Sequence, residues 1–119
     1  MIENWNAQRF EDEVLRDGRL AAVEFYSDGK PMFMGFGSKL DSVARQFSDK
    51  MIFGKINVKK EEALAEKYAV RSVPTLMVFC EGRGVGEVVG EADRNQLLRT
   101  ISTAMEKAEG KDNKKGNSF

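Results

Sequence analysis

The chain alternates between apolar runs of strand length and stretches whose apolar residues repeat at helical spacing. Residues 20–26, 51–58 and 75–80 are short and largely apolar. Runs of this length, bounded by turn residues, are typical of strands buried on both faces. Residues 85–89 follow the third run after the glycine-rich turn 81–84, a spacing that predicts a hairpin.

Four segments show the pattern of amphipathic helices. Asn6 is placed to cap the first, the stretch 61–70 forms a short third helix, and Asp93 with Gln96 makes a capping box for the last. The residues expected to face inward are Phe10, Val14 and Leu15, then Phe36, Leu40, Val43, Ala44 and Phe47, then Ala63, Leu64 and Tyr68, and finally Leu97, Leu98, Ile101 and Met105.

The predicted order is helix, strand, helix, strand, helix, strand, strand, helix. Helical connections between the early strands imply parallel pairing with right-handed crossovers. The last two strands form an antiparallel edge. We therefore expect an α/β fold in which helices cover both faces of a mixed sheet.

The composition indicates one globular domain. The 119 residues are 41% hydrophobic and 32% charged, which is ordinary for a folded domain. We expect this domain to span residues 1–106. Residues 107–119 are polar and hold few apolar side chains to offset their ordering entropy, so they are expected to form a disordered tail.

The net charge of the chain and the length of its apolar runs argue against nucleic acid and membranes as partners. Nineteen basic and nineteen acidic residues cancel, which argues against nucleic acid because phosphate contacts need a basic excess. No apolar run reaches membrane-spanning length, so no membrane partner is expected. The first residues have neither a basic nor an apolar leader segment, and we expect a cytoplasmic protein.

Two residue types needed for common catalytic sites are scarce. The chain has one cysteine, Cys80, and no histidine. An internal disulfide, a cysteine–histidine pair, a Ser-His-Asp triad and a histidine-based metal site are therefore impossible. We expect no metal and no cofactor.

Four segments match a known pattern. They are AAVEFYSDGKPMF, FGKINV, YAVRSVPTLMVFCEG and VVG, which align with V-D-F-W-A-x-W-C-G-P-C, A-K-x-N-x-D, Y-x-I-x-x-I-P-T-L-x-x-F-x-x-G and x-V-G. The sequence thus resembles the thioredoxin family, without a gap from Val23 to Gly90, and over about residues 2–106 when the flanking helices are included. The resemblance implies the thioredoxin fold, a central mixed sheet of four to five strands flanked by four helices.

The resemblance also implies a groove for extended chains. Pro74 matches the family's cis-proline, which leaves the backbone of Val73 free to pair with a bound peptide. Gly90 matches the glycine that lets that peptide approach closely. Val58, Val73 and Val89 are expected to line the apolar rim.

The departure from the family lies at its reactive motif. Lys30-Pro31-Met32-Phe33 stands where the family has C-G-P-C. Disulfide exchange needs an attacking thiolate and a second thiol to resolve the mixed disulfide, so we expect no catalytic residue. Met32 and Phe33 serve either as a docking surface or as local packing under the loop, and Lys30 is available to contact an acidic ligand.

Glu24 and Lys55 fall on the family's buried aspartate and its neighbouring lysine. Without the reactive cysteine, we expect a buried charge pair rather than a proton-transfer role. Burial raises the pKa of the carboxyl group and the lysine lowers it, so the sequence leaves the net direction open.

The sequence leaves three functions open. The favoured one is a monomeric module that binds an extended peptide or partner protein without chemistry. The second is a thioredoxin-like disulfide oxidoreductase whose activity is lost, residual or dependent on Cys80, although Cys80 is expected roughly 16 Å along its strand from Thr75. The third is an assembly role in which the groove is a dimer contact.

Overall fold

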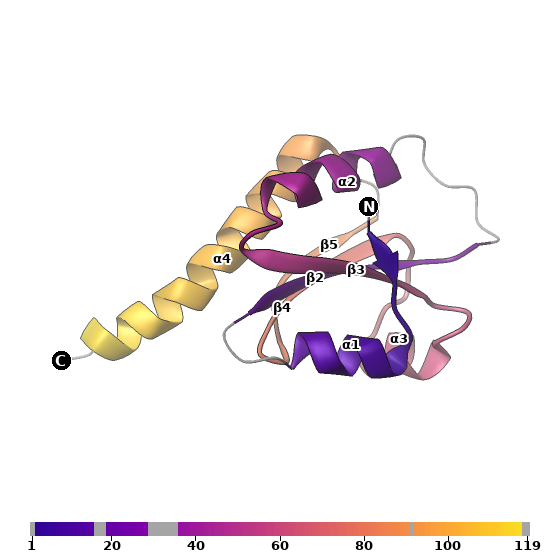
Figure 1. Ribbon diagram of the computed structural model, residues 1–119, viewed down its shortest axis with the longest axis horizontal. Coiled ribbons are helices and arrows are strands. Elements are labelled where there is room, and N and C mark those ends of the chain that lie inside the picture. The colour runs from indigo at the N-terminus through magenta and orange to yellow at the C-terminus, as the bar shows by residue number, and fades with distance from the viewer. Residues whose placement is uncertain (1, 16–18, 29–35, 91, 118–119) are drawn as a thin grey trace.

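Five strands and four helices make up the part of the chain that the computed structural model describes, namely residues 2–15, 19–28, 36–90 and 92–117 (Figure 1). In chain order they are β1 (Glu3–Asn4), α1 (Ala7–Val14), β2 (Leu20–Tyr26), α2 (Phe36–Gln46), β3 (Met51–Asn57), α3 (Glu62–Lys67), β4 (Thr75–Cys80), β5 (Arg83–Val89) and α4 (Arg94–Asn117).

The strands form one mixed sheet in the order β1-β3-β2-β4-β5. β2 and β3 are parallel, as predicted, with Glu24 opposite Lys55. β4 runs antiparallel to both β2 and β5, so the prediction of parallel pairing is wrong for the third apolar run. The reason is the length of α3. Its six residues span only about 9 Å, whereas a seven-residue strand such as β3 spans about 23 Å. The chain therefore re-enters the sheet at the end where it left.

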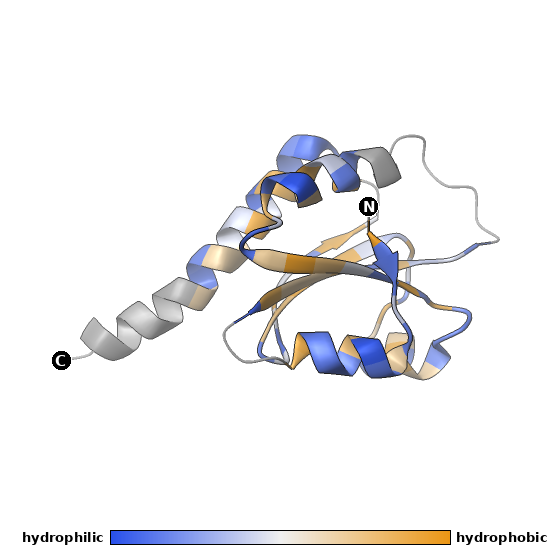
Figure 2. Ribbon diagram, viewed as in Figure 1, coloured by the Kyte–Doolittle hydropathy of each residue, from blue (hydrophilic) through white to orange (hydrophobic). Residues whose placement is uncertain are grey.

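Helices cover both faces of the sheet. Figure 1 shows α1 and α3 on one face, with α2 and α4 on the other. Side chains alternate along β2: Ala21, Val23 and Phe25 join the core beneath α1 and α3, while Ala22 joins the core beneath α2 and α4. Figure 2 shows the apolar residues concentrated on the strands and hydrophilic residues along α1.

Aromatic rings fill the core beneath α1. The Phe10 ring meets Phe79 edge to face with 5.5 Å between centroids, and Tyr68 lies 5.5 Å from Phe10. Trp5 packs directly over Gly54, where a Cβ atom would lie 2.1 Å from the indole Cε2 atom. Only glycine therefore fits beneath this ring.

The residues predicted to face inward are buried or half-buried, with two exceptions, and the Phe36 side chain lies outside the described residues. Leu15 is 59% exposed and lies past the end of α1 at Val14, as its C-cap residue. In α3 the buried residues are Leu64 and Ala65, whereas Ala63 is exposed. The six-residue helix contacts the core with one turn, and Ala65 lies on that side.

Both predicted helix caps are present. The Asn6 side chain accepts a hydrogen bond from the Arg9 amide at 2.8 Å, and Asp93 accepts one from the Gln96 amide at 2.8 Å. No helix in the described part of the chain is long and apolar enough to cross a bilayer.

Helix α4 extends to Asn117, well beyond the sheet (Figure 1). The sequence predicts a disordered tail from residue 107, and the structure differs over residues 107–117. Extending an existing helix adds a backbone hydrogen bond per residue without a new nucleus. The helix dipole also favours the several lysines of this segment near its C-terminal end. The domain boundary at residue 106 stays a prediction.

Candidate functional site

A turn around Pro74 lies between the end of α3 and the start of β4. The Val73–Pro74 peptide bond is cis. The Pro74 carbonyl accepts a hydrogen bond from the Gly90 amide at 2.7 Å, and the Thr75 hydroxyl donates to the Ser72 carbonyl at 2.7 Å. These bonds hold the turn against the end of β5, so four predicted site residues, Val73, Pro74, Val89 and Gly90, come together.

The β5 side of this turn is open and apolar. Val89 is 59% exposed although it is a large hydrophobic residue. Gly90 has a φ of 85°, and no atom lies within 4 Å of the position where its Cβ would be. The positive φ favours glycine, and the open space allows another chain to approach the backbone.

A cavity of about 330 Å³ lies on the other side of Val73. It brings Val73 together with Val58, a predicted rim residue from the end of β3. Sequence reasoning missed the rest of its lining, which consists of Ser27, Lys59, Val70, Arg71 and Ser72. One signal was available: Ser27 stands where the aligned family pattern has alanine.

The Asn57 side chain forms hydrogen bonds to residues on two sides of this cavity. Its side-chain amide donates to the Asp28 carboxylate at 2.9 Å, and its side-chain oxygen accepts from the Lys59 amide at 2.9 Å. Asp28 follows Ser27 at the end of β2, and Lys59 follows Val58 at the end of β3. The buried Asn57 side chain therefore ties the two strand ends together.

The remaining predicted peptide-binding residues, Lys30, Pro31, Met32 and Phe33, lie outside the described residues. The part they play in the site therefore stays a prediction from the sequence.

Glu24 is buried on the sheet face beneath α2, at 5% exposure. Lys55 lies opposite it in β3. Among the described residues, however, no ion pair within 4.0 Å joins the two side chains. The Lys55 amine instead lies 5.2 Å from the centroid of the Tyr26 ring. The predicted charge pair stays a prediction from the sequence, and the Lys55 charge still acts on Glu24. A half-buried lysine can keep its amine over an aromatic ring and near water.

The direction of the Glu24 pKa, which the sequence left open, follows from this arrangement. Loss of hydration on burial raises the pKa above its ordinary value of 4.5; the Lys55 charge opposes the rise, and the negative charge of Asp41 in α2 adds to it. Burial outweighs the attraction to Lys55.

We predict that Glu24→Gln stabilises the protein at neutral and alkaline pH. The folded state holds the Glu24 proton to a higher pH than the unfolded state, so this residue's contribution to stability is complete below pH 4.5 and is lost as pH rises through the raised pKa. Chemical unfolding at pH 4 and pH 8 checks this. The free energy of unfolding of the variant should exceed that of the wild type only at pH 8. Asp41→Asn removes a like charge near Glu24, so in that background Glu24→Gln should stabilise the protein less at pH 8. A Glu24→Gln protein that is less stable than the wild type at pH 8 would contradict the raised pKa of Glu24.

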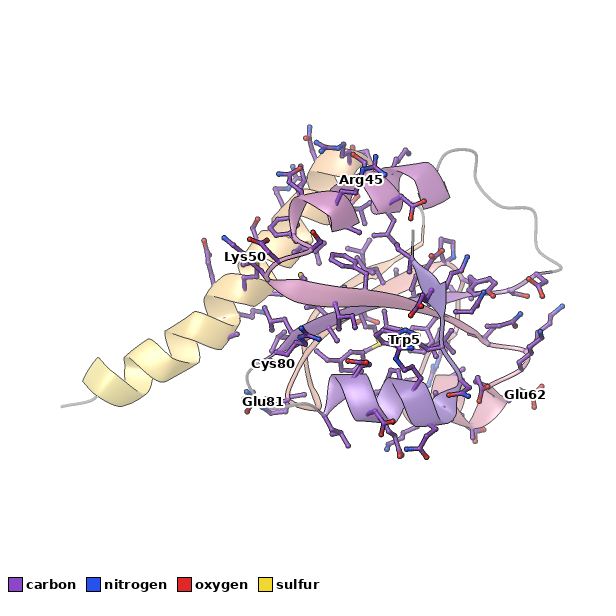
Figure 3. All side chains as sticks on the ribbon, viewed as in Figure 1. Trp5, Arg45, Lys50, Glu62, Cys80 and Glu81 are labelled. Atoms are coloured by element: carbon purple, nitrogen blue, oxygen red, sulfur yellow. The ribbon has the colours of Figure 1, made fainter. Side chains whose placement is uncertain are left out.

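Cys80 is a free, half-buried thiol at the far end of β4. It lies opposite Leu20 at the start of β2, whereas Thr75 lies opposite Phe25 near the end of β2. Figure 3 shows Cys80 and the first residue of α3, Glu62, on opposite sides of the molecule. Cys80 is therefore remote from the Pro74 turn. Among the described residues, no group of three or more acidic or cysteine side chains is placed to hold a metal ion.

A mixed five-stranded sheet between two helical layers, with a cis-proline turn beside the end of the edge strand, is the arrangement of a thioredoxin-fold domain. The comparisons with known proteins agree. A model of the family described as Thioredoxin matches residues 1–103. The chain is 30% identical over 92 residues to the thioredoxin of Griffithsia pacifica (77% of this chain and 84% of the relative). It is 41% identical over 83 residues to the thioredoxin of Chlamydia caviae (70% and 80%).

A solved structure gives the same result. A mutant thioredoxin from Halobacterium salinarum NRC-1 superposes with a TM-score of 0.72 at 28% identity, covering 87% of this chain and 89% of that one. The chain belongs to the thioredoxin family.

Proposed function

We propose that this protein binds an extended peptide or an unfolded segment of a partner protein at the Pro74 turn, and that it does so without disulfide exchange. The observation that supports the proposal is an open, apolar surface beside the cis-proline turn, on a chain that has only one cysteine. The cis-proline turn presents Val73 between exposed Val89 and a cavity of about 330 Å³. The family's two cysteine positions are Lys30 and Phe33.

The physical basis is pairing of an extended chain with the backbone at Val73. Such pairing supplies hydrogen bonds that any sequence can make, and adjacent apolar pockets supply selectivity. Val89 on one side and Val58 on the other are placed for that second role. We infer that the protein acts as a monomer, and that its single cysteine suits the reducing conditions of the cytoplasm.

Val73→Asp should weaken this binding. A cysteine-free display library of nine-residue peptides would be selected on the wild type, and the dissociation constants of selected peptides compared between variants. A carboxylate at position 73 replaces an apolar contact with the bound chain by a charged group that must lose its water, so affinity should fall about 10-fold or more.

Leu15→Asp is the control: it introduces the same carboxylate at an exposed apolar residue that lies beside the turn at Gly82, away from Pro74. Thermal unfolding verifies that both variants fold. Equal binding by Val73→Asp and the wild type would remove the Pro74 turn from the proposal.

A redox role is the second candidate, and the names of the relatives favour it more directly than they favour binding alone. The composition of this chain weighs against it, because a dithiol mechanism needs two thiols and Cys80 is remote from Pro74. Turnover of insulin disulfides by the wild type at a thioredoxin-like rate would establish the redox role and overturn the proposal.

A further inference from the structure

Ser27 supplies a hydroxyl group to the lining of the cavity beside Val73. Ser27 is only 6% exposed and lines the cavity. Within the described part of the chain, its side chain has no hydrogen-bond partner. A hydroxyl that makes no bond to described protein atoms is available to donate to a ligand acceptor. The family pattern places alanine at this position, so the hydroxyl is a feature of this chain.

Two cationic side chains line the same cavity from different walls. Lys59 follows the end of β3, and Arg71 lies in the loop before Val73. Both are exposed, and neither forms an ion pair with another described residue. None of the described residues that line the cavity is acidic, and the carboxylate of nearby Asp28 accepts a hydrogen bond from Asn57.

The rest of the lining is mainly apolar. Val58, Val70 and Val73 supply its walls. A ligand that suits this cavity therefore combines an anionic end with an apolar stem. The carboxylate accepts from guanidinium, ammonium and hydroxyl donors, and the methylene groups contact the valines. Glutamate and aspartate side chains have this composition.

We propose that the cavity lined by Ser27, Lys59 and Arg71 selects an acidic side chain of the extended peptide bound at Val73. This inference rests on the proposed function and deepens it by naming the class of ligand. The peptide backbone pairs at Val73, and the neighbouring acidic side chain enters the cavity, where it neutralises the two cations and accepts from the Ser27 hydroxyl.

The test uses the cysteine-free peptides selected on the wild type. Glutamate and aspartate should be enriched at one position of the selected set, and replacing that residue with glutamine should weaken binding about 10-fold, which is the usual loss when a charge-assisted hydrogen bond is removed. Added salt should reduce the preference, because exposed cations are screened.

Substitutions in the cavity lining show how much each residue contributes to the preference for an acidic side chain. Arg71→Gln and Ser27→Ala should each reduce the glutamate-to-glutamine preference several-fold. Lys50→Gln should leave this preference unchanged. Lys50, labelled in Figure 3, precedes β3, whereas Lys59 follows the other end of that strand. Peptides that depend on Val73 but bind equally well with glutamine would overturn the acidic selectivity and leave the proposed function intact. If the library yields no peptide that binds in a Val73-dependent way, the proposed function fails, and the inference fails with it.

Discussion

A Lys30→Cys/Phe33→Cys double variant should reduce insulin disulfides in the presence of dithiothreitol, with turnover far above that of the wild type. The substitutions restore an attacking thiolate and a resolving thiol at the family's two positions. The first thiolate attacks a substrate disulfide sulfur and releases one substrate thiolate; the second then attacks the mixed disulfide and releases the other. After this exchange the two introduced cysteines form an internal disulfide, and dithiothreitol reduces it back to the dithiol.

The expected gain depends on parts of the site that the chain has kept. The cis bond before Pro74 and the open backbone at Gly90 are present, so a substrate chain can pair with the backbone at Val73. Lys30→Cys alone is the control: it should form mixed disulfides without turnover, because no second thiol resolves them. If the oxidised double variant forms no internal disulfide, positions 30 and 33 do not have the family's geometry.

Phe10→Ala should lower the free energy of unfolding by about 3–5 kcal/mol. Phe10 is 1% exposed, and its ring contacts those of Phe25, Tyr68 and Phe79. Removing it leaves a cavity that three aromatic neighbours on different elements cannot jointly fill. Because small domains have total stabilities of about 5–15 kcal/mol, this single change threatens the fold.

Guanidinium unfolding of Phe10→Ala measures the loss directly. Leu15→Ala is the control from the same segment of chain, and because Leu15 is 59% exposed it should cost about 0.5 kcal/mol or less. Similar losses in the two variants would contradict the assignment of the aromatic cluster as the core beneath α1.

The sequence predicted the fold because its main signals are local. β2 and β4 have the bounds of the apolar runs 20–26 and 75–80, and both helix caps are present. The two-residue strand β1 was missed, because Glu3 and Asn4 are polar and too few to show a pattern. The direction of β4 was missed because it depends on the length of α3, which is a property of the whole connection.

The candidate site was predictable in part. The resemblance pointed to Val73, Pro74, Val89 and Gly90, and the structure brings these residues together. Lys59 and Arg71 are separated by α3 in the sequence, and only the folded chain places both on one cavity. The relation of Glu24 to Lys55 was also beyond sequence reasoning, because strand register fixes their backbones but not where a long lysine side chain ends.

The central claim is that recognition of extended chains here requires no sulfur. The most direct test is the affinity of selected cysteine-free peptides for Cys80→Ser, a variant without any thiol, measured with and without dithiothreitol. We expect the wild-type dissociation constant under both conditions. Loss of binding in Cys80→Ser, or binding by the wild type that dithiothreitol abolishes, would contradict the claim and assign the activity to the thiol.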